Sequence, residues 1–391
     1  MRLAIEKKDL LHHIQHLAAV VPTKNTSPIL TNYLFVVDAE SSTVQITATD
    51  LEITVVVKFN ALVSEGGSIA IAARQFNEII SSMPDQVINL YKDEDLLKIQ
   101  CGRIDFSLMC ADYTLFPVLP LREMDNAIQV DAALFNKMVE KTIFAVSTDV
   151  NRAVLTGVMW LITDKFHMMS ATDGRRVSEI KVNESLPTMS VPQAPATEEN
   201  IFTGSNEFES IERIVPVKTL SFLQKVFDSS VKELRVLIDT NRIVFGYDKF
   251  TIFSQIIDHK YPDYRKAFVP NLPNTVVIGV SELRSTIRRI SLLAPEENLR
   301  VRFEFANDSF EINTTNRETG EAKQVMENFS YQGTETSISI NYKFMVNILD
   351  AIDTEKVRIC LGSGKEPLMI YNEPSAGENQ EITFLLMPLR S

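Results

Sequence analysis

The feature that most constrains this 391-residue chain is an order of segments that occurs three times. Residues 68–83, 213–228 and 337–352 each show a short strand pattern that leads directly into an amphipathic helix. A new apolar strand follows each of these segments. Phe76, Leu220 and Phe344 take matching positions in these segments. A repeat of this length predicts one supersecondary unit present in three copies, and it has to be recognised before any domain is assigned.

A second set of helices opens each unit and gives the same count. Leu10, Leu134 and Leu283 align within the three predicted opening helices, which are 6–21, 134–146 and 281–293. Apolar residues in the first of these recur with the i, i+3/4, i+7 spacing of a half-buried helix. We therefore predict three domains, covering residues 1–125, 126–272 and 273–391.

The strands outside these helices alternate apolar and polar residues, as in 43–59. This pattern favours antiparallel sheets with one face on the helices and the other face wet or at an interface. We predict an α+β fold in which each domain packs two helices together on one side of its sheets. The Pro, Ser and Glu content of residues 185–212 predicts a mobile insertion in the middle domain.

Composition narrows the classes of protein that the chain can represent. An apolar fraction of 45% and a charged fraction of 23% are ordinary for a globular protein. No apolar run reaches the roughly 20 residues of a membrane helix, and the charged N-terminus does not resemble a secretory signal, so we expect a cytoplasmic protein. Cys101, Cys110 and Cys360 make neither a disulfide framework nor a CxxC metal site, which predicts free thiols.

Motifs for catalysis and metal binding are absent from the sequence. It lacks GxGxxG, a complete P-loop, HExxH, GxSxG and zinc-spaced Cys/His sets, so we predict no catalytic residue, no metal and no cofactor. His12 and His16 have a spacing that could ligate a metal, but a solvated or phosphate-facing stripe with Lys8 is the favoured interpretation. Asp50 and Asp173 each follow Ala-Thr, which favours Asx turns at strand ends over acid–base roles.

The distribution of charge is uneven. The six predicted helices carry a net charge of +4, whereas the whole chain carries −12. Lys137/Lys141 and Arg284/Arg288 are like-charge pairs at i, i+4, and each costs an isolated helix about 0.2–0.5 kcal/mol. An external anion facing this stripe would remove the cost, although an ordinary solvated basic face is the alternative explanation.

Several short motifs, in this order, resemble one family. They are PIL (28–30), ATDLE (48–52), RAVLTG (152–157), ATDGRR (171–176), YPDYR (261–265), the helix at Asn341 and LLMPLR (385–390). Over nearly its whole length the chain resembles the bacterial DNA polymerase III beta subunit, the replicative sliding clamp. The resemblance implies a non-enzymatic protein with three copies of one domain per chain, helices inside and sheets outside. Two chains would join head to tail into a closed ring of six domains.

The resemblance also implies that the ring encloses duplex DNA and contacts it without reading its sequence. The residues expected to face DNA are Lys24, Arg74, Lys137, Lys141, Lys218, Arg284 and Arg288. Lys24, Arg74 and Lys218 match family positions, and the other four come from the charge stripe. The implied partners are double-stranded DNA, a second copy of the chain, the DNA polymerase III catalytic subunit, the clamp loader, and other polymerases and repair proteins that carry clamp-binding peptides. No membrane partner is expected.

A second implied site is an apolar cleft for those peptides. Its expected residues are Leu155, Thr172, Gly174, Arg175, Arg176, Val177, Pro262, Pro367, Leu385, Met387, Pro388, Leu389 and Arg390. Without the family, Leu155, Val177 and Leu385 would be interpreted as ordinary core. Arg175 stands where many members have His, and Ala153 and Val154 replace aromatic residues common beside Arg152.

The dimer contact implied by the resemblance is also apolar. Phe106 and Leu108 of one chain are expected to meet Leu292 and Leu293 of the other. Two alternatives remain open at this point: a peptide-binding scaffold that does not bind DNA, and a cytosolic enzyme on a repeated scaffold, which would need a deep pocket with convergent polar groups.

Overall fold

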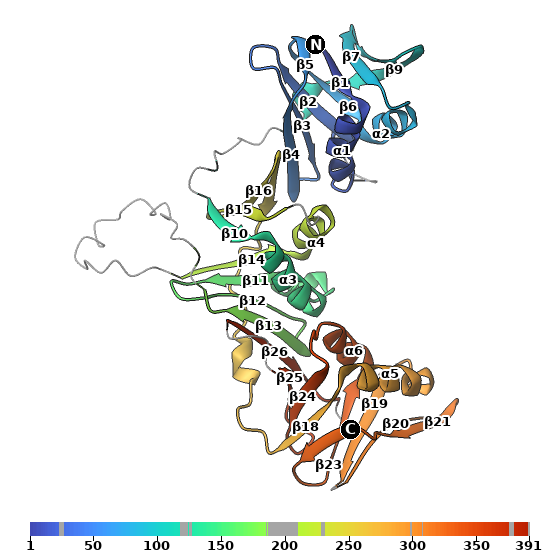
Figure 1. The fold of residues 1–391 in the computed structure, drawn as a ribbon, viewed down its shortest axis with the longest axis vertical. Helices are drawn as coiled ribbons and strands as arrows, with labels where there is room; N and C mark the ends of the chain where they lie inside the picture. The colour runs from blue at the N-terminus through green and yellow to red at the C-terminus, as the bar shows by residue number, and fades with distance from the viewer. Residues whose placement is uncertain are drawn as a thin grey trace, which may run out of the picture. The chain divides into compact units, whose positions relative to one another are not determined.

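The computed structural model describes residues 1–391 except 23–26, 118–123, 125–126, 185, 187–209, 228–230, 298, 307, 375–378 and 390–391. Within the described residues, one order of strands and helices occurs three times (Figure 1). The first repeat contains β1 (Arg2–Glu6), α1 (Lys7–Ala18), β2 (Asn32–Asp38), β3 (Thr43–Thr49), β4 (Ile53–Asn60), β5 (Leu62–Glu65), β6 (Gly67–Ala72), α2 (Ala73–Ser82), β7 (Val87–Asp93), β8 (Leu96–Cys101) and β9 (Ile104–Ala111).

The other two repeats follow the same plan. The second contains β10 (Ile128–Asp131), α3 (Ala132–Thr142), β11 (Gly157–Ile162), β12 (His167–Thr172), β13 (Arg176–Val182), β14 (Ile211–Pro216), α4 (Val217–Val226), β15 (Glu233–Ile238), β16 (Arg242–Tyr247) and β17 (Phe250–Gln255). The third contains β18 (Asn274–Gly279), α5 (Val280–Ile290), β19 (Arg300–Ala306), β20 (Ser309–Asn316), β21 (Gly320–Val325), β22 (Phe329–Gln332), β23 (Thr336–Asn341), α6 (Tyr342–Asp350), β24 (Lys356–Leu361), β25 (Leu368–Glu373) and β26 (Gln380–Leu386).

Each of these helices begins at the residue directly after a strand, and equivalent backbone bonds fix this geometry. The first amide of the opening helix donates to the carbonyl just before the strand that follows the second helix. The three bonds are Lys7 to Gln86 at 3.2 Å, Ala132 to Lys232 at 2.9 Å and Val280 to Glu355 at 2.9 Å. The repeat inferred from the sequence is therefore confirmed at the level of single hydrogen bonds.

Two of the sequence alignments are wrong by one residue. Counted from the helix starts, Leu10 corresponds to Phe135 rather than Leu134, and Phe76 corresponds to Met345 rather than Phe344. Phe135 is 1% exposed and Met345 is 0% exposed, whereas Leu134 and Phe344 are only half-buried. Neighbouring apolar residues hid the correct register, because a helix stripe about 100° wide accepts either of two adjacent side chains.

The sheets are antiparallel and run across the borders between repeats. A 13-stranded sheet among the described residues has the order β10-β15-β16-β17-β4-β3-β2-β6-β9-β8-β7-β1-β5, and a nine-stranded sheet has the order β14-β11-β12-β13-β26-β25-β24-β18-β22. The remaining strands form a four-stranded sheet in the order β21-β20-β19-β23. The α+β architecture of three repeated domains is thus confirmed.

We call the strand pair that links two consecutive repeats a joint. In the first joint β17 pairs with β4, with Ser254 opposite Ile53. In the second joint β26 pairs with β13, with Leu386 opposite Arg176. We compared the joints by following the paired strands, residue by residue, from the start of each helix to the joint. Ser254 and Leu386 then occupy the same position in their repeats, and so do Ile53 and Arg176. Both joints therefore have the same register.

The chain condenses into two compact units, each described here by itself. The first comprises the described parts of Met1–Leu134 and Lys218–Ile256, and the second comprises those of Phe135–Thr188, 210–217 and Ile257–Ser391. Each unit holds one whole repeat, part of the middle repeat and one joint. Helices α1 and α2 contact each other in the first unit and α5 and α6 in the second, as expected from the sequence.

Two smaller expectations meet the structure differently. Most of the predicted insertion 185–212 lies outside the described residues, but Ile211 and Glu212 belong to strand β14, so its expected end is wrong. The side chain of Asp50 accepts from the Glu52 amide, and that of Asp173 from the Arg175 amide, which confirms the two Asx turns. The residue after each aspartate, Leu51 or Gly174, has a positive φ of 78° or 86°.

Candidate functional site

The basic residues expected to face DNA lie on the helices, and the six that the structure describes all have carboxylate partners; Lys24 is outside the described residues. Arg74 of α2 pairs with Glu78 at 2.9 Å, and both side chains are largely exposed. Lys218 of α4 pairs with Asp50 and, at 2.9 Å, with Glu52 in the turn between β3 and β4.

Asp350 of α6 pairs with two of the arginines of helix α5, Arg284 and Arg288. Its carboxylate lies 2.9 Å from Arg284 Nη1 and 3.1 Å from Arg288 Nη2. The repulsion expected between these arginines is therefore offset by a carboxylate of α6, and no external anion is needed for it. Since their side chains remain 35% and 59% exposed, the guanidinium groups stay accessible to a phosphate.

Lys141 does not lie at a surface, so its assignment to a DNA-facing stripe is wrong. It is 2% exposed, and its Nζ donates to the Ala351 carbonyl at 2.6 Å and to the side chain of Asp353. The last turn of α3 lies beneath the turn between α6 and β24, which buries position 141. Lys137, one turn earlier, donates to Gln380 at 2.8 Å and keeps 35% of its side chain exposed.

The apolar residues of the expected peptide cleft form two clusters in the second unit. Leu155 packs with Met159, Met168, Ile214 and Tyr261. Val177 and Leu385 pack with Met369. Tyr264 packs against both clusters, so they form one continuous apolar region. Leu155, Val177 and Leu385 are at most 7% exposed, which is the burial of core residues as well as of cleft floors.

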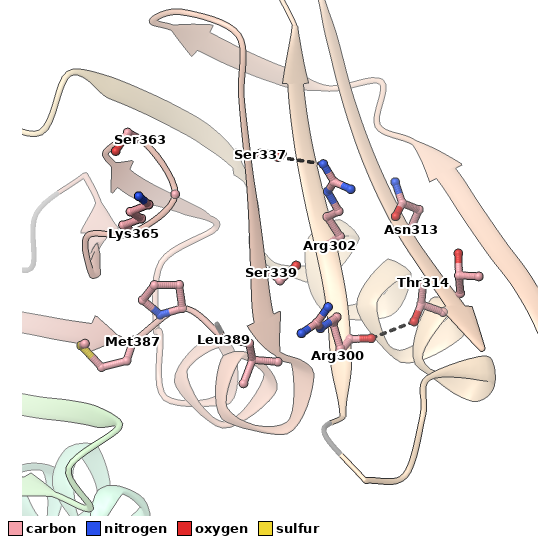
Figure 2. Close-up of a pocket in the computed structure, with 13 residues that line it drawn as sticks. Arg300, Arg302, Asn313, Thr314, Ser337, Ser339, Ser363, Lys365, Met387 and Leu389 are labelled. Carbon is pink, nitrogen blue, oxygen red and sulfur yellow. Dashed lines mark hydrogen bonds between the residues drawn. The ribbon is translucent and has the colours of Figure 1, made fainter. Parts of the chain in front are cut away.

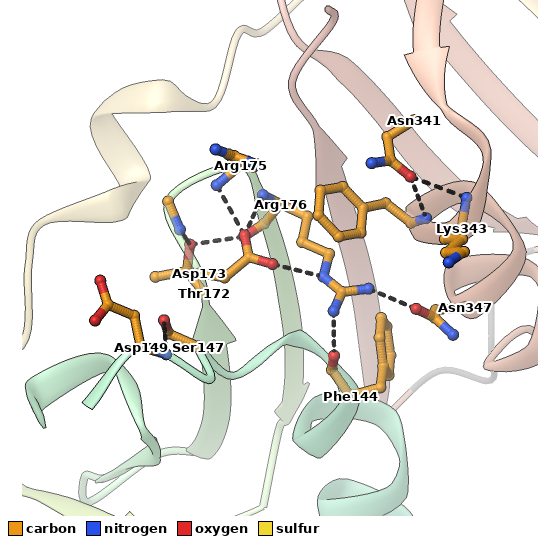
Figure 3. Close-up of polar contacts among 12 residues, drawn as sticks. Phe144, Ser147, Asp149, Thr172, Asp173, Arg175, Arg176, Asn341, Lys343 and Asn347 are labelled. Atoms are coloured by element: carbon orange, nitrogen blue, oxygen red, sulfur yellow. Dashed lines mark hydrogen bonds and ion pairs between the residues drawn. The ribbon is translucent and has the colours of Figure 1, made fainter. Parts of the chain in front are cut away.

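Arg176 is the centre of a polar network beside this region (Figure 3). Its guanidinium donates to Asp173 at 3.0 Å, to Asn347 at 2.8 Å and to the carbonyl of Phe144 at 2.6 Å. It also lies 4.4 Å from the centre of the Phe344 ring, a cation–π distance. Arg176 is 7% exposed, and its buried guanidinium supports the turn between β12 and β13.

Hydrogen bonds between side-chain hydroxyls and the backbone hold the rest of that turn. The Thr172 amide donates to the Tyr261 hydroxyl at 3.0 Å, and the Thr172 hydroxyl donates to the Arg176 carbonyl at 2.6 Å. A Cβ on Gly174 would lie 3.2 Å from the Arg152 guanidinium, and the positive φ also favours glycine. Arg175 is exposed, so this departure from the family changes the rim of the region rather than its interior.

The chain terminus closes one side of the region. The amide of Met387 donates to the Arg175 carbonyl, and the amide of Leu389 donates to the Ser339 carbonyl, both at 2.8 Å. Met387 is 38% exposed, and Pro388 and Leu389 are half-buried. Pro262 is exposed, Pro367 is half-buried and Arg390 lies outside the described residues.

Sequence reasoning missed the residues that fix the segment over the two clusters. The hydroxyl of Tyr264 donates to Glu179 at 2.5 Å, and Arg265 donates to the same carboxylate at 3.2 Å. Burial raises the pKa of both Tyr261 and Tyr264 far above the usual range, so both stay protonated. The YPDYR motif contains both tyrosines and Arg265, but the resemblance implies a cleft role only for its Pro262.

Two exposed sheet edges carry the residues expected at a dimer contact. Strand β9 pairs with β6 only at Ala111 and Cys110, and Phe106 on its outer part is 40% exposed. Strand β21 has β20 as its partner in the described chain. Beside it, in the 3₁₀ turn Ser291–Leu293, Leu292 is 82% exposed. Leu108 and Leu293 are half-buried.

Other kinds of site find little support in the described chain. Within it, His, Cys, Asp and Glu side chains nowhere gather in a group of three or more that could hold a metal ion. Every helix in the same residues is too short or too polar to cross a membrane. Cys101, Cys110 and Cys360 are free thiols.

Three solved structures have this fold along the full chain. They are the DNA polymerase III subunit beta from Pseudomonas aeruginosa (24% identical, TM-score 0.88), the beta subunit from DNA polymerase of Streptococcus pyogenes (23%, TM-score 0.89), and a DNA polymerase sliding clamp from Bacillus subtilis (25%, TM-score 0.87). Each comparison covers 100% of this chain and at least 99% of the other.

Sequence comparisons agree with the structural ones. Beta sliding clamps of Staphylococcus epidermidis and Bacillus subtilis are 27% and 26% identical to this chain, with 100% of both chains covered. Family models for the N-terminal, central and C-terminal domains of the DNA polymerase III beta subunit match residues 1–120, 129–263 and 266–390. The chain therefore belongs to the DNA polymerase III beta subunit family, whose members include the beta sliding clamps.

Proposed function

We propose that two copies of this chain join head to tail into a closed ring that encircles duplex DNA and slides along it. The observation that carries this proposal is the pair of joints with one register. Three repeats in a row use two joints, and one half of a third joint is left at each end: the outer edge of β9 and the edge of β21. In a pair of chains, the β21 edge of one copy can therefore pair with the β9 edge of the other, and each copy completes the third joint of its partner.

The register of the two observed joints specifies the third. Carried along the same ladders, it places Phe106 opposite Ala322 of the partner, and Leu108 opposite Gly320 of the partner. The exposed Ile104 and Phe106, which share one face of β9 with Leu108, then pack against the end of α5, where Leu292 is exposed. A heterologous contact of this kind yields a closed ring only when the rotations close, and in the proposed ring two copies of three repeats would supply six such joints.

Equivalent basic positions in helices α2 and α4 add a polar element to the joint. Lys218 is the second residue of α4, and it pairs with Asp50 and Glu52 across the first joint. Arg74 is the second residue of α2. Asn316 caps the turn between β20 and β21 as Asp50 caps the turn between β3 and β4, because each accepts from the amide two residues later. Arg74 is therefore expected to pair with Glu318 of the partner.

The helix faces are suited to weak, sequence-independent contact with DNA. Lys24, Arg74, Lys137, Lys218, Arg284 and Arg288 are the proposed contacts, and the described ones share their charge with Glu78, Asp353, Glu52 or Asp350. Phosphates then compete with carboxylates, so each contact is shallow and the ring can move. Retention comes from closure, and the net charge of −12 disfavours DNA binding elsewhere on the surface.

We further propose that, of the three domains 1–125, 126–272 and 273–391, the second and third present an apolar cleft around Leu155, Val177 and Leu385 to partner peptides. Such peptides belong to the DNA polymerase III catalytic subunit, the clamp loader and other polymerases and repair proteins. The ring would then act in the cytoplasm as a processivity factor rather than an enzyme. The buried position of the three side chains, the ring of Tyr264 over them and the adaptable Met387 support this cleft.

The ring is tested by mass and by cross-linking. Light scattering should give twice the chain mass of 44.1 kDa. The pair Phe106→Cys and Ala322→Cys should form an intermolecular disulfide on oxidation, whereas Phe106→Cys with Lys323→Cys, shifted by one residue to the other face of β21, should form far less. A stable monomer at micromolar concentration, or equal cross-linking by both pairs, would contradict the proposal.

A further inference from the structure

A polar hollow in the second unit lies next to the C-terminal segment and has a volume of about 860 Å³ (Figure 2). One wall is the outer face of β19 and β23, with Arg300, Arg302, Ser337 and Ser339. The opposite wall is the loop after β24, with Ser363 and Lys365. Met387, Pro388 and Leu389 form the end that adjoins the proposed peptide cleft.

The charge of this hollow is opposite to that of the protein. Arg300, Arg302 and Lys365 line it, and no carboxylate is among its lining residues, although the chain has 51 acidic and 39 basic residues. The remaining polar lining consists of hydroxyl and amide side chains, which are neutral hydrogen-bonding groups. A ligand that fits this lining carries negative charge at one end and apolar surface at the end near Met387.

The walls are held in place by specific contacts. Gly364 has a φ of 92°, and a Cβ there would lie 2.6 Å from the Ser337 carbonyl, so the loop with Lys365 packs directly on β23. Glu366 accepts from the Ser363 amide at 2.9 Å, which fixes the same loop. The Leu389 amide donates to the Ser339 carbonyl at 2.8 Å and fixes the apolar end. The hollow is preformed, so a ligand does not have to order it.

We infer that this hollow binds an acidic residue of a partner peptide whose apolar residues occupy the cleft beside Met387. This inference rests on the proposed peptide-binding function and deepens it, because it states a charge preference for the partner. Arg302 donates to Ser337 at 2.9 Å and pairs with Glu304 at 3.0 Å, which leaves it aligned along the wall. Lys365 is exposed on the opposite wall, so a peptide carboxylate between them meets cations from both sides.

The test uses fluorescein-labelled nine-residue peptides and the full chain. One peptide has two aspartates before two adjacent leucines, and the other has the two aspartates after them. The control for each peptide has asparagines in place of the aspartates. The better acidic peptide should bind about three- to tenfold more tightly than its control, since carboxylates gain charge-assisted hydrogen bonds in the hollow. Lys365→Gln and Arg302→Gln should each remove most of that gain and leave the neutral peptide unaffected.

A matched change outside the hollow is Lys165→Gln, in the exposed turn between β11 and β12, and it should change neither affinity. Equal binding of acidic and neutral peptides to the unmodified chain would overturn the inference and leave the cleft intact. A single-stranded oligothymidylate that depends on Lys365 more strongly than the acidic peptide does would also overturn it, because the hollow would then be a phosphate site. Failure of the ring itself would appear separately, as a monomer in light scattering.

Discussion

Arg176, the first residue of β13, donates a hydrogen bond of 2.8 Å to the side chain of Asn347 in helix α6, so a single side chain ties the middle repeat to the third. The same guanidinium holds Asp173 at 3.0 Å. Arg176 is 7% exposed, and burial lowers the pKa of its guanidinium from the usual value while Asp173 opposes that effect. A buried charge of this kind is tolerated only while its partners remain.

Replacement of this arginine should therefore destabilise the fold. Arg176→Met should lower the free energy of unfolding by about 3 kcal/mol, because Asp173 is left nearly buried without its partner. Urea unfolding followed by circular dichroism measures the change. Arg175→Met, at the exposed neighbouring position, should cost less than about 0.5 kcal/mol. Equal losses from the two variants would show that the network does not stabilise the second joint.

The arrangement of elements could be predicted from the sequence because the repeat offers three independent copies of each signal. The strand-and-helix segment expected at 213–228 contains the helix Val217–Val226, and that expected at 68–83 contains the helix Ala73–Ser82. The exchange of Leu134 for Phe135 shows the limit of the method. Adjacent apolar residues fit one helix stripe equally well, and only packing, here Phe135 against Trp160 with ring centres 5.3 Å apart, selects one.

The candidate sites were less accessible from the sequence. Lys137 and Lys141 share a helix face, but the turn after α6 covers only the second, and that turn is more than two hundred residues away in the chain. The carboxylate of Asp350 between Arg284 and Arg288 is likewise a long-range contact. Leu155, Val177 and Leu385 could be assigned to a cleft through the family resemblance alone, since their burial matches that of core residues.

His167 predicts how stability depends on pH. It is fully buried, both ring nitrogens lack a hydrogen-bond partner, and burial lowers its pKa from 6.5 to about 4. Between pH 6.5 and about 4, His167 is therefore protonated in the unfolded chain and neutral in the folded chain. Stability should be complete above pH 6.5 and fall by up to about 3 kcal/mol as the pH drops toward 4.

His167→Phe should remove this contribution, so that stability falls less between pH 6.5 and 4, as measured by urea unfolding at several pH values. His13, whose pKa burial also lowers to about 4, should retain its own share in that variant. His259→Phe, at an exposed position, is the matched control. An unchanged pH profile in His167→Phe would mean that the imidazole is solvated in the native state.

The carboxylate of Asp350 should lower the affinity of Arg284 and Arg288 on α5 for DNA. Asp350→Asn removes the carboxylate shared by Arg284 and Arg288, so the slope of log affinity against log salt should steepen by about one to two. Fluorescence anisotropy with a labelled duplex at several salt concentrations measures it. Asp164→Asn, in an exposed turn, should leave the slope unchanged. A slope insensitive to Asp350→Asn would remove these arginines from the DNA-facing set.

The pseudo-equivalence of Lys218 and Arg74 predicts a charge swap. Arg74→Glu should shift the equilibrium toward monomer by about two- to fivefold, because it faces Glu318 of the partner with a like charge. Glu318→Arg alone should act in the same direction. The double variant should restore dimerisation, as measured by sedimentation at several concentrations. If the double variant dimerises no better than the singles, these two residues do not meet.

The central claim is that closure, rather than affinity, keeps the protein on DNA. The most direct measurement loads the Phe106→Cys, Ala322→Cys protein on nicked circular duplex under reducing conditions, seals the ring by oxidation, and follows retention during gel filtration in high salt. The sealed protein should stay with the circle and leave when a restriction enzyme cuts it once. Equal retention on circular and linearised DNA, or loss from both, would contradict the account.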